Sequence, residues 1–161
     1  FVTSPQQRIL LERFYLYPEL KAHTVPYSVD LQDLSLRQKS EELRKKLNVP
    51  LNAKIAITVT DMLEKTEMIH ILTAFQKVAI KKSNVRLIVV GHGPHFKAIE
   101  YEMLNLALPS KVIFTGALPQ YEIPDYIDLA DVYINLSSRS AGFESNTFEA
   151  MAQQKIVVGS D

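Results

Sequence analysis

The chain has 161 residues, of which 47% are hydrophobic and 22% charged, as in a globular domain with a single core. Its 18 basic and 18 acidic residues balance, so it lacks the positive charge typical of nucleic-acid binders, and we expect no nucleic-acid partner. The absence of cysteine excludes disulfides and thiolate metal sites, and no apolar run is long enough to span a bilayer.

The first third of the chain predicts two helices joined by an extended segment. Ser4 and Pro5 begin a capping-box pattern, which predicts a helix over residues 4–15 that ends before Pro18. Residues 23–29 form a Pro-bearing connector. A charged helix with inward-facing leucines is predicted over residues 36–47.

The rest of the chain alternates strands with helices. Apolar strands are predicted at residues 54–59, 85–90, 111–114, 132–136 and 156–159. Helices are predicted between them at residues 67–82, 94–106, 121–128 and 145–153. This alternation predicts an α/β, Rossmann-like fold whose parallel sheet has helices on both faces. Ligands of such sheets bind beyond the carboxyl ends of the strands.

The last of these helices begins after an apolar strand and a polar loop. Backbone N–H groups at such a helix start favour a phosphate, and Ser145, Asn146 and Thr147 occupy this position. Ordinary N-capping is the alternative explanation of the same polar residues, and both interpretations can hold together. Glu149, further along, can accept hydrogen bonds from sugar hydroxyls, although a solvated helix glutamate is the commoner case. Phosphate and sugar together indicate a nucleotide or a nucleotide-sugar.

Three glycines follow other strands. Gly116 would let a flat base approach the backbone, or it is only a turn glycine. Gly91 and Gly93 follow a strand and open a helix, as in half of a dinucleotide-binding fingerprint. The third glycine and the carboxylate for an NAD ribose are missing, so a tight turn is preferred and an NAD-type oxidoreductase is the weakest alternative.

A family resemblance rests on the segment from Gly142 to Ala152, with Glu149 followed by Ala150-Met151-Ala152. This segment resembles the donor-binding motif of retaining GT-B glycosyltransferases of glycosyltransferase family 4, the group 1 type. Other matching segments are Val25–Asp30, Leu87–Pro94, Val112–Gly116 and Leu129–Val132. The resemblance implies the C-terminal domain of a GT-B fold. We expect residues 1–25 to come from the acceptor domain and residues 26–161 to form a donor domain truncated at its C-terminus. The sequence is then a fragment that is inactive by itself.

The resemblance also implies functions for individual residues. Glu149 would hold the donor ribose, Ser145 to Thr147 the diphosphate and Gly116 the base, while Gly91 and Gly93 lie near the donor sugar. Lys65, expected in the loop after strand 54–59, and Glu144 would serve catalysis.

The implied enzyme transfers a hexose from a nucleoside-diphosphate sugar to an acceptor glycan, lipid or protein. It needs no metal or other cofactor, because cationic side chains and the helix N-terminus stabilise the leaving diphosphate. We expect a cytoplasmic protein, and association with a membrane surface is compatible with this function.

Two positions depart from the family pattern. Asp61 stands where the family has an arginine, and an aspartate there would repel a diphosphate. Ala141 stands where the family has a glutamate facing the donor sugar, with Glu144 nearby as a partial substitute. The alternative hypothesis is therefore a catalytically impaired GT-B-like subunit that acts as the partner or stabiliser of an active transferase.

Overall fold

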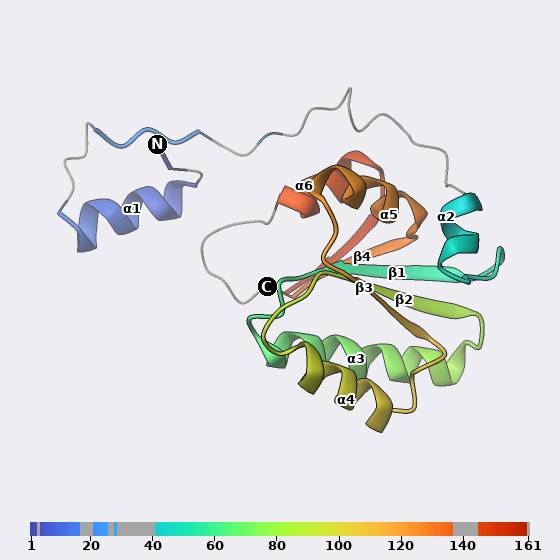
Figure 1. Ribbon diagram of the computed structural model, residues 1–161. Coiled ribbons are helices and arrows are strands. Elements are labelled where there is room, and N and C mark those ends of the chain that lie inside the picture. The colour runs from blue at the N-terminus through green and yellow to red at the C-terminus, as the bar shows by residue number, and fades with distance from the viewer. Residues whose placement is uncertain (3, 17–20, 26–27, 29–40, 137–144, 161) are drawn as a thin grey trace.

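A five-stranded parallel sheet forms the centre of the molecule (Figure 1). The computed structural model describes residues 1–2, 4–16, 21–25, 28, 41–136 and 145–160. The strands are β1 (Lys54–Val59), β2 (Val85–Val90), β3 (Val112–Gly116), β4 (Val132–Asn135) and β5 (Ile156–Gly159). Their order across the sheet is β3-β2-β1-β4-β5.

Helices cover both faces of this sheet (Figure 1). One face carries α3 (Lys65–Lys81) and α4 (Phe96–Asn105). The other face carries α2 (Glu41–Lys46), α5 (Ile123–Leu129) and α6 (Ser145–Ala152), and the 3-10 helix η2 (Gln120–Glu122) leads into α5. The predicted Rossmann-like α/β fold is confirmed.

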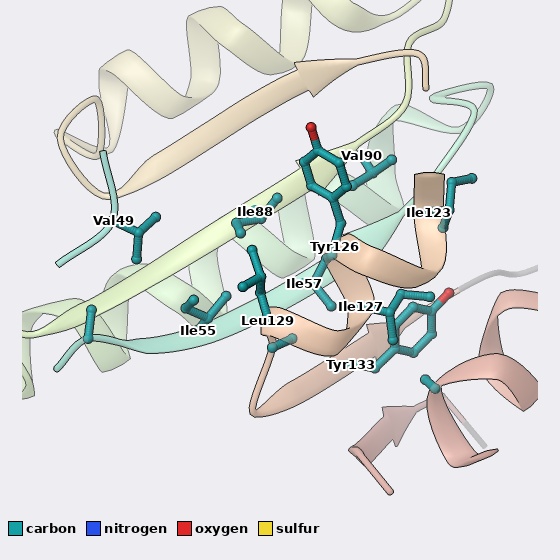
Figure 2. Close-up of a cluster of buried hydrophobic side chains, with 13 residues drawn as sticks. Val49, Ile55, Ile57, Ile88, Val90, Ile123, Tyr126, Ile127, Leu129 and Tyr133 are labelled. Atoms are coloured by element: carbon teal, nitrogen blue, oxygen red, sulfur yellow. The ribbon is translucent and has the colours of Figure 1, made fainter. Parts of the chain in front are cut away.

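Each face of the sheet has its own apolar core, which explains why β1 and β2 are apolar along most of their length. On one face, α5 places Tyr126 and Ile127 over Ile57 and Ile88 of the sheet (Figure 2). On the other face, α3 and α4 pack against the alternate side chains of β2, including Leu87 and Val89, neither of which is exposed. Strands β1 and β2 are therefore packed on both of their faces.

Several element boundaries differ from those predicted. Helix α3 begins at Lys65, two residues early, so Lys65 is the first helical residue and not a loop residue. Strand β3 continues to Gly116, because Gly116 pairs with Val90 at an irregularity in the ladder. The predicted helix at residues 121–128 is a 3-10 turn followed by α5, with Pro124 in the first helical turn. Of the helix predicted at residues 36–47, the described part is α2.

Helix α1 (Pro5–Phe14) confirms the predicted N-terminal helix and its cap. The Ser4 hydroxyl accepts a hydrogen bond from the Gln7 backbone N–H at 3.2 Å. The helix buries none of its residues, and Phe14 is 75% exposed. The boundary between residues 25 and 26 remains a prediction, since residues 26 and 27 lie outside the described residues.

The strand order creates a topological switch point between β1 and β4. The chain runs outward from β1 through β2 to β3, and then returns to the other side of β1 to form β4 and β5. Crossovers on the two sides of this point lie on opposite faces of the sheet. Open parallel sheets bind ligands beyond the strand ends at such a point, so the region beyond the carboxyl ends of β1 and β4 is where a ligand crevice is expected, and we call it the switch-point crevice. In the described part of the chain, no helix has the length and apolar character needed to cross a membrane.

Candidate functional site

Two helices begin on either side of the switch-point crevice. Helix α3 follows β1 and begins at Lys65, and helix α6 follows β4 and begins at Ser145. The turns after β2 and β3, which contain Gly91 and Gly116, lie at the same edge because all five strands are parallel. The fold therefore brings the described residues of the predicted site to one edge of the sheet.

Glu149 is held at this edge by a side chain from another element. Its Oε1 atom accepts a hydrogen bond from the Gln120 amide at 3.4 Å. Its Oε2 atom is buried and has no hydrogen-bond partner among the described residues. Burial raises the pKa of the Glu149 carboxyl above its ordinary value, and the Gln120 hydrogen bond offsets part of this increase. The carboxylate thus keeps accepting capacity that the described protein does not use.

The three polar residues at the start of α6 have different surroundings. Ser145 is exposed, and the Asn146 Oδ1 atom accepts a hydrogen bond from Gln120 at 3.3 Å. Thr147 is only 2% exposed, and its hydroxyl accepts a hydrogen bond from the Asn135 amide at 3.0 Å. The Thr147 side chain is therefore engaged inside the protein. Helix geometry leaves the N–H groups of this first turn without acceptors inside the helix, so they are the groups available to an anion.

Helix α3 contributes a positive charge at its N-terminus, on the β1 side of the switch point. Lys65 is exposed at the first position of α3. A lysine in the first turn opposes the helix dipole, an arrangement that a bound anion would make favourable. Asp61 is used locally, since its Oδ1 atom accepts a hydrogen bond from the Leu63 backbone N–H at 3.1 Å. This turn gives the unexpected aspartate a structural function.

Gly91 and Gly93 allow the turn after β2 to pack directly on the turn after β1. A Cβ atom at Gly91 would lie 1.7 Å from the Thr60 carbonyl oxygen, and one at Gly93 would lie 1.8 Å from the Asp61 carbonyl oxygen. No side chain fits at either position without moving the backbone. These glycines thus fix the relative position of two loops at the crevice.

A glycine is favoured at position 116 because of the backbone conformation there, and not because neighbouring atoms leave no room for a side chain. Its φ of +75° is in the left-handed region, and its carbonyl oxygen accepts a hydrogen bond from the Gly91 N–H at 2.9 Å. A Cβ atom added at Gly116 would meet nothing within 4 Å. The open space beside this backbone could admit a flat ring.

Part of the predicted site lies outside the described residues. Glu144, Ala141 and the Gly142-Phe143 pair belong to the segment 137–144, so their placement is not described. Among the described residues, no group of three or more histidine or carboxylate side chains is arranged to hold a metal ion. A hollow of about 570 Å³ lies elsewhere, beside α3, β4 and β5, and its lining is almost wholly apolar, with Phe75 and Val158 among the residues that form it. It offers few polar partners to a phosphate or sugar.

Sequence reasoning missed two residues of this site. Gln120 bonds both Asn146 and Glu149, and Asn135 bonds Thr147. Gln120 lies 29 residues before Glu149 in a 3-10 turn and belongs to no motif, so no sequence signal pointed to it. Asn135 could have been noticed as a polar residue at the end of an apolar strand.

Comparison with known proteins identifies the family to which this chain belongs. Residues 39–161 match the family described as Glycosyl transferases group 1, and the chain belongs to this family. A curated relative, alpha-monoglucosyldiacylglycerol synthase from Streptococcus pneumoniae, is 26% identical over 74% of this chain. The match spans only 28% of that relative, which is well under a third of its length.

Solved structures of glycosyltransferases share the fold. HepE from Anabaena, in complex with UDP and glucose, matches 98% of this chain and 43% of its own chain, with a TM-score of 0.76 and 20% identity. The C-terminal domain of a group 1 glycosyl transferase from Francisella tularensis matches 82% of this chain and 70% of its own, with a TM-score of 0.66 and 21% identity. The fold is thus that of the C-terminal domain of GT-B glycosyltransferases.

Proposed function

We propose that this chain binds the nucleoside-diphosphate sugar of a retaining glycosyltransferase that transfers a hexose to an acceptor. The observation that carries the proposal is the Glu149 carboxylate, which is held by Gln120 beside the switch-point crevice and has one oxygen without a partner among the described residues. This oxygen is buried, so a ribose hydroxyl would reach it only after the residues around it move apart, and the carboxylate would then accept a hydrogen bond from it. Membership of the group 1 family supports a donor of this kind.

The rest of the proposed site follows from the elements around the crevice. The first-turn amides of Ser145, Asn146 and Thr147 bind the diphosphate, and the base lies along the open side of Gly116. Lys65 stabilises the negative charge of the departing diphosphate, so that no metal or other cofactor is required. Glu144 is proposed to face the donor sugar.

The turn of Gly91 and Gly93 completes the site indirectly. Its packing against Thr60 and Asp61 fixes the path of the connection from β1 to Lys65. Gly91 also bonds Gly116, so the same turn supports the proposed base site. In this proposal both glycines lie near the donor sugar and hold two ligand-binding loops together.

The nature of the sugar and of the acceptor is inferred from relatives. The Anabaena structure contains UDP and glucose, and the name of the Streptococcus relative describes the synthesis of a glucosylated diacylglycerol. These relatives favour a hexose donor. The acceptor, a glycan, a lipid or a protein, would bind to parts of the whole protein other than the site described above.

The test is a donor assay on the full-length protein. UDP-, GDP- and ADP-hexoses are offered with acceptors, and the release of nucleoside diphosphate and the anomeric configuration of the product are measured. Glu149→Ala should weaken nucleoside-diphosphate binding about 10- to 100-fold, as expected for the loss of hydrogen bonds to a charged group. The matched control is Glu42→Ala, an exposed glutamate of α2 that should bind like the wild type. Unchanged binding by the Glu149 variant would contradict the proposed site.

A second candidate function is favoured by Asp61. In the family that the sequence resembles, this position carries a positive charge. In this chain the Asp61 carboxylate closes a turn at the edge of the crevice. A subunit that has lost catalysis and stabilises an active transferase would fit this substitution. Nucleoside-diphosphate binding without turnover of any donor in the same assay would favour this candidate over the enzyme.

A further inference from the structure

Gln120 connects two parts of the crevice that are distant in the sequence. It begins η2 at the start of the crossover from β3 to β4, while Asn146 and Glu149 lie on α6 after β4. Strands β2 and β1 lie between β3 and β4 in the sheet. The Gln120 amide is therefore a direct link between the β3 side of the crevice and the helix on its β4 side.

The chemistry of the contact suits an orienting function. The Nε2 atom of Gln120 donates to Asn146 Oδ1 at 3.3 Å and to Glu149 Oε1 at 3.4 Å. An amide nitrogen has two N–H groups and can serve both oxygens at once. Because the amide is neutral, it fixes the position of the carboxylate and leaves its negative charge in place. A lysine at the same position would neutralise that charge. The negative charge remains available to hydroxyl donors.

We propose that Gln120 is a positioning residue for ribose recognition, which holds the Asn146 and Glu149 side chains in one arrangement so that nucleotides are selected by their ribose hydroxyls. This inference rests on the proposed function, in which Glu149 contacts the ribose. Gln120 is exposed and lies outside every motif of the sequence. The inference about its function therefore rests on its hydrogen bonds to Asn146 and Glu149.

The experiment compares ribose with deoxyribose. The full-length protein is titrated with UDP, GDP and ADP, and the tightest binder is then compared with its 2′-deoxy and 3′-deoxy forms. Gln120→Leu should reduce the preference for the ribose form about three- to tenfold, because Glu149 loses the hydrogen bond that orients it. Gln120→Glu keeps the length of the side chain, removes both donors and should reduce the preference at least as much. Tyr121→Leu, at the next position, which is 74% exposed, should leave the preference unchanged.

The outcomes separate this inference from the proposed function. If Glu149→Ala removes the preference and the Gln120 variants retain it, the positioning function is wrong and the proposed site stands. An equal loss of affinity for ribose and deoxyribose forms in the Gln120 variants would also overturn the positioning function. If Glu149→Ala keeps the preference, or if none of the three nucleoside diphosphates binds, the proposed function and this inference fail together.

Discussion

At the scale of single residues, the burial of the Glu149 carboxylate has a cost in stability. Its carboxyl group is desolvated by burial, which raises its pKa, and a single hydrogen bond from Gln120 offsets only part of that effect. An ionised carboxylate with an unused oxygen is unfavourable in the free protein. A ligand that donates hydroxyl hydrogen bonds would relieve this penalty, so the same feature favours binding.

This penalty predicts a pH-dependent stabilisation by Glu149→Gln. With its pKa raised above 4.5, folded Glu149 binds its proton more tightly than in the unfolded chain. The contribution of Glu149 to the free energy of unfolding therefore falls as pH rises from about 4.5 through the folded pKa, and the penalty is complete above it. The variant should be more stable than the wild type at pH 7, and the difference should shrink as pH falls towards 4.

Urea unfolding of the full-length protein at several pH values measures this difference. Glu42→Gln, the same substitution at an exposed position of α2, is the matched control. Parallel curves for Glu149→Gln and the wild type between pH 4 and 7 would show that Glu149 titrates alike in the folded and unfolded chains.

Gly93 gives a second prediction at this scale. A side chain at this position would clash with a neighbouring loop but would not strain the backbone of residue 93, so only packing is tested. A Cβ atom there would lie 1.8 Å from the Asp61 carbonyl oxygen, and no positive φ is involved. Gly93→Ala should lower the free energy of unfolding by about 1–3 kcal/mol, the usual range for overpacking. Gly159→Ala, whose Cβ would lie 3.5 Å from the Asn135 oxygen, is the matched control. Equal chemical-denaturation midpoints for the two variants would mean that the two loops separate easily.

At the residue scale, the sequence predicted which residues lie at this edge of the sheet, but it did not predict the hydrogen bonds between their side chains. Glu149, Gly116 and Lys65 could be proposed because strand ends and motif spacing place them there. The bond from Gln120 to Glu149 could not, because it joins side chains 29 residues apart through tertiary packing alone. The bond between Asn135 and Thr147 was missed for a related reason, since a hydroxyl at a helix start predicts capping and not an inward contact.

At the scale of elements, α6 is held in place by a buried ion pair with α5. Lys155, in the turn after α6, donates to the Asp128 carboxylate at 3.1 Å and to the Asp128 carbonyl oxygen at 2.6 Å. The two side chains are 9% and 6% exposed. The Gln153 amide donates to the Pro124 carbonyl oxygen nearby. These contacts fix the helix that carries Glu149 to the helix that follows Gln120.

Lys155→Met should therefore destabilise the protein strongly. It leaves the buried Asp128 carboxylate without its cation, a change that costs about 3–5 kcal/mol. Lys97→Met removes an exposed ion pair with Glu100 and should cost less than about 1 kcal/mol. Thermal and urea unfolding of the full-length protein compare the two variants. Similar losses of stability would show that the Asp128–Lys155 pair contributes no more than a surface pair.

Element boundaries were predicted less well than element types. Each strand of the described residues, and each helix described between strands, was predicted, because apolar runs and helical periodicity are local signals. The earlier start of α3 was missed because its first two residues, Lys65 and Thr66, are exposed and lie outside the periodic pattern. The longer β3 was missed because a glycine at the end of a strand normally indicates a turn, whereas here Gly116 pairs with both Val90 and Gly91.

At the scale of the whole molecule, the strand order determines where a ligand can bind. The sequence predicted a parallel sheet, but not that β4 lies beside β1, which follows from tertiary pairing of Ala56 with Val132 and Ile57 with Tyr133. This pairing creates the switch point and brings Lys65 and α6 to the same crevice. We propose that a nucleoside diphosphate binds in this crevice.

Hydrogen exchange of the full-length protein, measured with and without the tightest binder among UDP, GDP and ADP, tests this claim most directly. Amides of residues 145–149 at the start of α6 and of residues 115–117 at the end of β3 should exchange more slowly when the nucleotide is bound. Amides of α1, which lie outside the proposed site, should not change. Slower exchange confined to other segments, with α6 unaffected at a saturating nucleotide concentration, would contradict the account.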